Sequence, residues 1–276
     1  MMKRIVGFVA LLFVLSIFGA CVHTGEPPVK APVSAGIEAI LKRGELVVGT
    51  AGSMPPLNMT TKSGQVIGLE PDLALMMASA MGVKLRLATM PFVELLSALE
   101  RGDVDMVMSD MTITPKRNLE VAFVGPYFIS GKSILTKKNT IAAATNTEDI
   151  NTPQTSLTAL KGSTSQIFVE KLLPKAQLVL ARDYDAAVAL VIDGKVDAMV
   201  ADYPICLISV LRYPEEGLAS LVKPLTFEPI GVALPGNDPL LLNWVQNFFG
   251  MLEGSGELEA LRAKWFTDGS WLKELP

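Results

Sequence analysis

The chain contains one short pattern twice, and the two copies begin 92 residues apart. The copies are Gly102-Asp103-Val104-Asp105-Met106-Val107-Met108-Ser109-Asp110 and Gly194-Lys195-Val196-Asp197-Ala198-Met199-Val200-Ala201-Asp202. Each copy follows an apolar stretch of helical spacing that ends at its glycine, the usual residue at a helix C-terminus. Each copy then continues as an apolar segment of strand length and ends in an aspartate. The repeat therefore predicts two similar α/β lobes rather than one continuous domain.

The two copies end in a carboxylate at the place where open α/β sheets bind ligands, the carboxyl ends of strands. We therefore expect Asp110 and Asp202 to point at a cleft that the two lobes share. Chance is the alternative explanation, because the pattern Gly-x-Val-Asp is short.

The N-terminus predicts export from the cytoplasm. Lys3 and Arg4 precede an apolar run over residues 5–18, and Gly-Ala then leads to Cys21. This order is typical of a secretory signal, so we expect a signal peptide over residues 1–20. A cysteine after Gly-Ala resembles a bacterial lipobox, in which the thiol is lipidated, although Phe18 replaces the usual aliphatic residue. The alternative is a plain secretory signal with an incidental cysteine.

Residues 21–37 are expected to be the lipidated cysteine and a proline-rich, flexible tether. No second apolar run is long enough to span a bilayer, which predicts an extracytoplasmic protein held to a membrane only at Cys21. Without residues 1–20 the chain keeps 22 basic and 28 acidic residues, a net charge of −6. With this net charge the chain has no excess of basic residues to form the positively charged surface that binds nucleic acid. Cys206 is the only cysteine apart from Cys21, so it cannot form an internal disulfide or a multi-cysteine metal site. We therefore expect Cys206 to be a residue of the core. We also expect the protein to hold no metal and no cofactor.

Strands alternate with helices in both lobes, which predicts a mainly parallel sheet flanked by helices in each. The first lobe has expected strands at 45–50, 83–87 and 104–108, and helices at 71–81, 92–101, 240–249 and 258–265. The second has expected strands at 156–160, 178–180 and 196–200, and helices at 166–172, 183–192 and 204–211. Residues 125–135 and 227–234 are expected to form two antiparallel strands that cross between the lobes as a hinge.

Four segments of the chain resemble bacterial solute-binding proteins of family 3, the extracytoplasmic receptors of polar amino-acid ABC importers. They are 68–74 (GLEPDLA), 104–117 (VDMVMSDMTITPKR), 162–165 (GSTS) and 263–266 (AKWF). The resemblance implies a type II periplasmic-binding-protein fold, with lobe 1 over 38–130 and 229–276 and lobe 2 over 131–228. It also implies a monomer that closes on one free amino acid and then docks on the permease subunits of an importer.

The resemblance further implies how the ligand is held. Arg117 matches the arginine that clamps the α-carboxylate, and a planar guanidinium suits bidentate pairing; the alternative is a surface arginine at a helix start. Thr112, Ser163 and Thr164 would bind the same carboxylate, close to a helix N-terminus that favours an anion. Asp202 matches the acceptor of the α-ammonium group, and it could also cap the following helix. The other candidate ligand contacts are Ser109, Asp110, Phe92, Met54 and Leu160.

Several positions depart from the family pattern or have a second interpretation. Met54 stands where many members carry a stacking aromatic residue, and Ala51 where they often carry an aspartate that reads a basic side chain. Asp110 replaces a small residue, and a buried carboxylate is costly unless it is paired. It therefore either contacts a cationic part of the ligand or turns toward a lysine or water. The first alternative favours a cationic or neutral polar amino acid. Phe92 packs on the ligand or in the core, and Glu70 could simply orient its loop.

Two other functions use the same fold. Extracytoplasmic cyclohexadienyl dehydratases resemble these receptors and need a general acid, a role that Asp110 or Glu70 could fill. Retention of the ammonium partner Asp202 favours a receptor that is not an enzyme. Sensor domains also share the fold, but the chain shows no output domain, so sensing would act through a partner. No P-loop pattern is present, which excludes ATP chemistry of that type.

Overall fold

The computed structural model describes residues 35–144, 146–221 and 223–276. The predicted signal peptide, Cys21 and most of the tether lie outside these residues. Helix α1 (Ala35–Arg43) begins before the predicted end of the tether at residue 37. Residues 35–37 at the end of the predicted tether thus lie in α1, and Ile40 of this helix is fully buried in the core. Within the described ranges, no helix has both the length and the apolar character needed to cross a bilayer.

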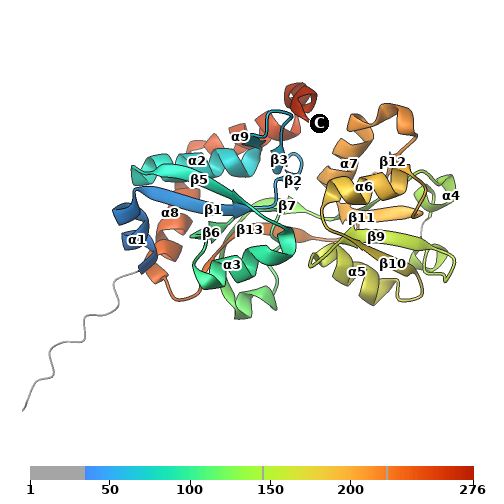
Figure 1. Cartoon of the computed structure of the whole chain (residues 1–276), viewed down its shortest axis with the longest axis horizontal. Coiled ribbons are helices and arrows are strands. Elements are labelled where there is room, and N and C mark those ends of the chain that lie inside the picture. Colours follow the sequence, from blue (N-terminus) through green and yellow to red (C-terminus); the bar gives the residue numbers. More distant parts are fainter. Residues whose placement is uncertain (1–34, 145, 222) are drawn as a thin grey trace, which may run out of the picture. The chain divides into compact units, whose positions relative to one another are not determined.

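Two five-stranded sheets form the centre of the fold, and both have the same topology (Figure 1). The first has the order β5-β1-β6-β13-β7 and the second β10-β9-β11-β8-β12. The strands of the first sheet are β1 (Glu45–Thr50), β5 (Lys84–Thr89), β6 (Met106–Val107), β7 (Val121–Ser130) and β13 (Glu228–Pro235). Those of the second are β8 (Lys132–Thr136), β9 (Ser156–Leu160), β10 (Gln177–Ala181), β11 (Ala198–Asp202) and β12 (Ala219–Ser220).

Each sheet is mainly parallel, as predicted. In the first sheet β1 pairs in parallel with β5 and β6, whereas β13 runs antiparallel to β6 and β7. In the second sheet β9 pairs in parallel with β10 and β11, and β8 runs antiparallel to β11 and β12. The two copies of the repeat supply the central strands β6 and β11, so the repeat in the sequence corresponds to a repeat in topology.

The internal aspartate of each copy has the same structural role in its own sheet. The Asp105 carboxylate accepts a hydrogen bond from the Val47 backbone N–H at 2.7 Å, and the Asp197 carboxylate accepts one from the Ser156 N–H at 2.8 Å. Arg43 forms an ion pair with Asp105, and Lys138 forms one with Asp197. Each aspartate thereby joins the turn after a helix to the neighbouring parallel strand, β1 in the first sheet and β9 in the second, which gives the repeat a structural explanation.

Helices cover the sheets and begin or end close to the expected residues. The first-sheet helices are α2 (Leu69–Met81), α3 (Leu95–Arg101), α8 (Pro239–Ser255) and α9 (Glu257–Phe266). The second-sheet helices are α4 (Asn139–Ala142), α5 (Thr164–Leu172), α6 (Tyr184–Ile192) and α7 (Tyr203–Arg212). Short 3₁₀ turns occur at η1 (Phe92–Glu94), η2 (Arg117–Leu119), η3 (Thr147–Asp149), η4 (Pro214–Glu216) and η5 (Gly269–Glu274). A small sheet, β2 (Ser53–Met54), β3 (Asn58–Thr60) and β4 (Val66–Ile67), was not predicted.

The chain passes between the sheets at two adjacent points. Strand β7 ends in the first sheet at Ser130, and β8 begins in the second at Lys132. The return strand β13 begins at Glu228, which is paired with Ser130. The two antiparallel crossing strands predicted from the sequence are confirmed, although the exact lobe boundaries stay a prediction.

Candidate functional site

The terminal carboxylates of the two repeat copies lie together, as the repeat predicted. Asp110 follows β6 of the first sheet and Asp202 ends β11 of the second, and the two carboxyl groups are close enough for each to act on the charge of the other. Both side chains are buried. Burial first, and then the nearby Asp202 and Glu70 carboxylates, raise the pKa of Asp110 well above its ordinary value, while Lys132 opposes this shift.

Asp110 is held in an uncommon backbone conformation. Its φ of 49° is the only positive φ of a non-glycine residue in the described part of the chain. Its backbone N–H donates to Glu70 Oε1 at 2.7 Å, and Asn58 Nδ2 donates to Glu70 Oε2 at 2.6 Å. The Tyr127 hydroxyl also donates to Glu70. Glu70 therefore does more than orient its own loop, because it fixes the residue that carries the Asp110 carboxyl.

Asp202 has a cation beside it that the sequence analysis missed. Lys132 Nζ lies 2.9 Å from Asp202 Oδ1 and 3.6 Å from Glu228 Oε2. The Lys132 side chain is 1% exposed. Ser130 Oγ donates to the same Asp202 oxygen at 3.3 Å. In the described residues the Asp202 side chain makes no capping hydrogen bond to α7, so its carboxylate is directed to this polar cluster.

Arg117 lies on η2 and contacts both halves of the fold. Its Nη1 donates to the Thr112 carbonyl at 2.8 Å, and its Nη2 donates to the Gly162 carbonyl at 3.3 Å. The guanidinium carbon is 5.6 Å from the centre of the Phe92 ring. Burial lowers the pKa of Arg117, and the carboxylates of Glu228, Asp110 and Asp202 act in the opposite direction. The guanidinium is therefore close enough to these carboxyl groups to interact with their charges.

The predicted hydroxyl groups differ in how many hydrogen bonds they already make within the protein. Thr112 Oγ1 and Thr164 Oγ1 are 3.2 Å apart and join the first half to the start of α5. Ser163 caps α5 by accepting from the Gln166 N–H at 3.2 Å, and it donates to the Leu160 carbonyl at 2.7 Å. Ser109 accepts from the Ala51 N–H at 2.8 Å and lies 3.7 Å from the Met54 sulfur. The two threonines can therefore turn to a ligand more readily than either serine.

The predicted apolar contacts belong to one buried cluster that draws on both sheets. Met54, Phe92 and Leu160 pack in it together with Tyr184. Burial, followed by the nearby Asp202 and Asp110 carboxylates, raises the pKa of Tyr184 well above its ordinary value. Phe92 touches both the core and Arg117, so its two predicted roles are compatible.

Three functional candidates had only weak signals in the sequence. Lys132 begins the otherwise uncharged segment that forms β8, and a lysine at such a position is a sign of a buried ion pair. Glu228 opens the return strand in the same way. Tyr184 starts a helix, where nothing in the sequence distinguishes it from an ordinary core residue.

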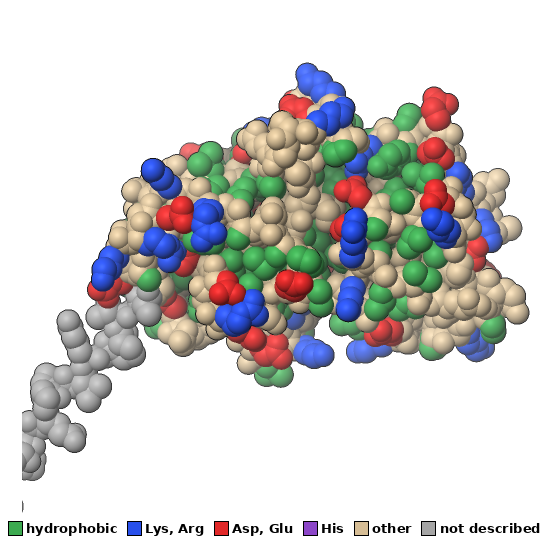
Figure 2. Space-filling model, in the orientation of Figure 1, with side chains coloured by type: hydrophobic (Ala, Val, Ile, Leu, Met, Phe, Trp, Pro, Cys, Tyr) green, Lys and Arg blue, Asp and Glu red, His purple; other side chains and the backbone are tan. Residues whose placement is uncertain are grey.

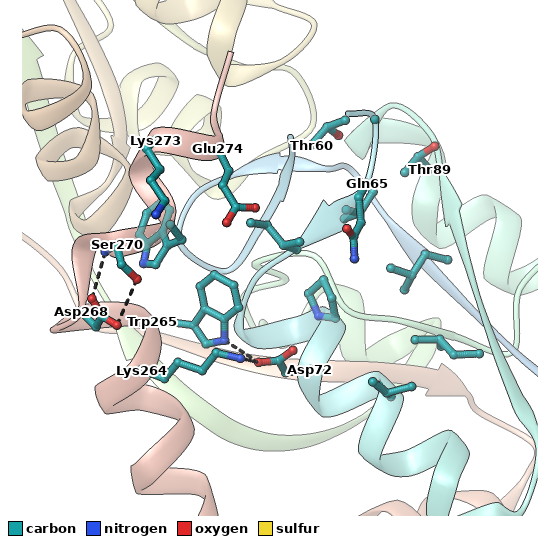
Figure 3. Close-up of a pocket in the computed structure, with 18 residues that line it drawn as sticks. Thr60, Gln65, Asp72, Thr89, Lys264, Trp265, Asp268, Ser270, Lys273 and Glu274 are labelled. Carbon is teal, nitrogen blue, oxygen red and sulfur yellow. Dashed lines mark hydrogen bonds and ion pairs between the residues drawn. The ribbon is translucent and has the colours of Figure 1, made fainter. Parts of the chain in front are cut away.

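A cavity of about 340 Å³ adjoins the cluster and is lined from both halves of the chain. Ala51 and Phe92 line it from the first half, and Arg182 and Asp183 from the second. A second cavity of about 820 Å³ lies near α2 and η5. There Asp72 accepts from Lys264 Nζ at 2.6 Å and from Trp265 Nε1 at 2.8 Å (Figure 3). The lining of this second cavity includes none of the predicted ligand contacts.

The surface charges of the described residues are mixed in sign. Lysine and arginine side chains are interspersed with aspartate and glutamate over the face shown in Figure 2. Such a face has no continuous basic stripe of the kind that follows a nucleic-acid backbone.

Known proteins are similar to this chain in both fold and sequence. A binding component of an ABC transporter from Wolinella succinogenes, solved in complex with lysine, is 35% identical, with a TM-score of 0.79 over 84% of this chain and 99% of the other. The L-cystine-binding protein TcyJ of Escherichia coli is 26% identical, covering 83% of this chain and 85% of the relative. Cyclohexadienyl dehydratase of Pseudomonas aeruginosa is also 26% identical, over the same shares of the two chains.

The family model of bacterial extracellular solute-binding proteins, family 3, matches residues 46–268. The match includes both sheets, the crossing strands and every candidate ligand contact. The chain belongs to the bacterial extracellular solute-binding proteins of family 3.

Proposed function

We propose that this protein is the extracytoplasmic amino-acid receptor of an ABC importer. It captures one polar amino acid, cationic or neutral, by closing two lobes, which we assign to residues 38–130 with 229–276 and to 131–228. The closed monomer then delivers the amino acid to the permease subunits in the membrane. The functions of the relatives, which include binding of lysine and of cystine, support this class of ligand.

The observation that carries the proposal is the placement of opposite charges from the two sheets around one buried position. Arg117 supplies a cation for the α-carboxylate, and Asp202 with Asp110 supplies acceptors for an ammonium group. A free α-amino acid carries both charges, and only a closed form can satisfy the two together. A ligand with this differential affinity shifts the protein to the closed form.

Calorimetric titration against the common amino acids tests the proposal. The purified protein is first unfolded and refolded to remove any amino acid that it carries. We expect one-to-one binding of one or a few polar amino acids, and loss of that binding in Arg117→Ala. An exposed arginine, Arg101, which pairs with Asp103 at the surface, gives the matched control Arg101→Ala. Silence across the whole panel contradicts the amino-acid assignment.

We further propose that Cys21 is lipidated and anchors the protein to a membrane facing the periplasm or the cell surface. The order of charged, apolar and small residues before Cys21 supports this proposal. One acyl chain binds a bilayer only marginally, whereas several chains anchor it stably. Mass spectrometry of the mature N-terminus should find an acylated Cys21, and Cys21→Ser should release the protein from the membrane fraction. An unmodified N-terminus at another residue contradicts the anchor.

A second candidate function is that of a cyclohexadienyl dehydratase. The raised pKa of the buried Asp110 favours a carboxyl group that still holds its proton, which is what a general acid needs. A relative of this activity is also similar over most of the chain. Turnover of prephenate by the refolded protein, lost in Asp110→Asn, would support the enzyme; tight amino-acid binding without turnover supports the receptor.

A further inference from the structure

The last residues of the chain, 269–276, form a segment that is held to the elements of the first sheet, and we call it the strap. Its Trp271 and Leu275 side chains are buried in the hydrophobic cluster of that sheet. The Lys62 backbone N–H, in the turn between β3 and β4, donates to the Glu274 carbonyl at 2.9 Å. The strap is therefore fixed to the lobe that we assign to the first sheet.

Arg212, the last residue of α7, reaches the strap from the second sheet. Its Nε and Nη2 donate to the Pro276 carbonyl oxygen at 3.3 Å and 3.0 Å. Its Nη1 donates to Asp185 Oδ1 of α6 at 2.7 Å, and its guanidinium carbon is 5.1 Å from the centre of the Tyr213 ring. Only 14% of the Arg212 side chain is exposed. The guanidinium is thus oriented by residues of its own lobe and donates to a residue of the other.

A second side chain of α7 adds an apolar contact. Ile208 is buried and belongs to the same hydrophobic cluster as Trp271 and Leu275. Among the described residues between 131 and 228, it is the only buried member of that cluster. Residues four apart lie on the same face of a helix, so Ile208 and Arg212 face the first lobe together.

These contacts coexist with the contacts across the candidate ligand site, where Arg117 donates to the Gly162 carbonyl. Helix α7 begins at the crossing between the lobes, because the Tyr203 N–H donates to the Gly131 carbonyl at 2.8 Å. Arg212 lies at the other end of this helix, about 14 Å away at 1.5 Å per residue. A hinge rotation that opens the site would therefore carry Arg212 away from a strap that is fixed to the other lobe.

Resting on the proposed function, we propose that the strap holds the two lobes closed on the ligand, and that Arg212 is the positioning residue that receives it. None of the strap residues is a candidate ligand contact, and neither is Arg212. The contact stabilises the closed form without touching the amino acid, so it slows the release of every ligand by the same factor. Ligand choice then depends on the site, whereas retention of the ligand also depends on the strap.

Stopped-flow tryptophan fluorescence of the refolded protein measures association and release, after calorimetry with the twenty common amino acids has shown which of them bind. Arg212→Gln should raise koff and Kd of each bound amino acid about 3- to 10-fold, the worth of a hydrogen bond. The rank order of the ligands should stay the same, and kon should change less than about twofold. The matched control is Arg86→Gln, because Arg86 is exposed and pairs with Glu45 within the first sheet at 2.8 Å.

Two further variants separate the strap contact from general stability. Arg212→Lys keeps a donor for the Pro276 carbonyl but loses the fork, so its koff should lie between those of the unmodified protein and Arg212→Gln. Ile208→Ala removes the apolar contact of α7 and should raise koff in the same way for every ligand. A variant that is merely less stable keeps the koff of its folded molecules, since release is measured on these alone.

Unchanged koff in Arg212→Gln overturns the inference while the receptor function stands. A change in koff that differs widely between ligands also overturns it, because the strap touches none of them. Absence of binding by every amino acid to the unmodified protein overturns the proposed function instead. If Ile208→Ala fails to fold, Arg212→Gln and Arg212→Lys still decide the question.

Discussion

Replacing Glu70 by glutamine tests whether the buried network beneath Asp110 is as specific as its geometry indicates. Both Glu70 oxygens act as acceptors, from the Asp110 N–H and Tyr127 on one side and from Asn58 Nδ2 on the other. Asn58 cannot flip to compensate, because its Oδ1 already accepts from the Gly52 N–H at 2.7 Å. Glu70→Gln therefore places two amide NH₂ groups against each other in the core.

The expected cost follows from the number of donors left without an acceptor. One buried donor without a partner costs about 1–3 kcal/mol, so Glu70→Gln should lower the free energy of unfolding by about 2 kcal/mol. For a protein of this size that corresponds to a fall in Tm of about 4–8 °C. Denaturant unfolding, with the slope unchanged and the midpoint shifted, measures the loss.

The reciprocal exchange provides the decisive control. Asn58→Asp added to Glu70→Gln restores a donor–acceptor pair with its direction reversed, because the introduced glutamine amide can now donate to the introduced carboxylate. That carboxylate also still accepts from the Gly52 N–H. We expect the double variant to recover at least half of the lost stability. Equal or greater instability in the double variant would refute the account of this network.

Three other substitutions test separate parts of the account. Gly68→Ala should destabilise strongly, by more than about 3 kcal/mol in denaturant unfolding, because φ is 140° and an added Cβ would lie 2.2 Å from the Leu57 carbonyl oxygen; near-normal stability would contradict this backbone. Asp197→Asn should lose about 1 kcal/mol at neutral pH. Hydrogen bonds and Lys138 lower the pKa of Asp197, so the stability difference between the two proteins should vanish as the pH falls through that pKa. A stability difference that does not change with pH would argue against the Asp197–Lys138 ion pair. Arg117→Lys should weaken amino-acid binding at least about tenfold in calorimetry, since an ammonium cannot form the guanidinium fork; unchanged affinity would argue against a bidentate clamp.

The topology could be predicted because the repeated pattern occupies corresponding positions in the two sheets. Two copies of Gly-x-Val-Asp place a helix end, a turn and a central strand at corresponding positions in each sheet. The internal aspartates Asp105 and Asp197 explain why the pattern recurs, since each accepts a hydrogen bond from a backbone N–H of the neighbouring parallel strand. The terminal aspartates, Asp110 and Asp202, meet because both strands end toward the same place.

The details of the site could not be predicted, because they depend on contacts between segments far apart in sequence. Nothing local to Lys132 shows that it pairs with Asp202, 70 residues later. The same holds for Glu70 and Tyr127, which are 57 residues apart. The structure also gives Ser109 and Ser163 hydrogen-bond partners within the protein, the Ala51 N–H and the start of α5, whereas their contact with a ligand stays a prediction.

Helix α1 and the small sheet were missed for a different reason. The sequence around Ala35 follows a proline-rich stretch, and the nine residues of α1 give too few turns for a clear apolar period. Strands β2 and β4 have two residues each, which is below the length at which alternation is visible. Helix α1 packs on β1 and α8, and the small sheet packs on α2 and α6, so both elements depend on contacts that are distant in sequence.

The most direct test of the account is a crystal structure of the refolded protein with the amino acid that binds it most tightly. The account predicts that the ligand carboxylate is within hydrogen-bonding distance of the Arg117 guanidinium and of Thr112 or Thr164. It also predicts that the α-ammonium group of the ligand lies within hydrogen-bonding distance of the Asp202 or the Asp110 carboxyl group. A ligand in another cavity, such as the one beside Asp72 and Trp265, or bound without contact to Arg117, would contradict it.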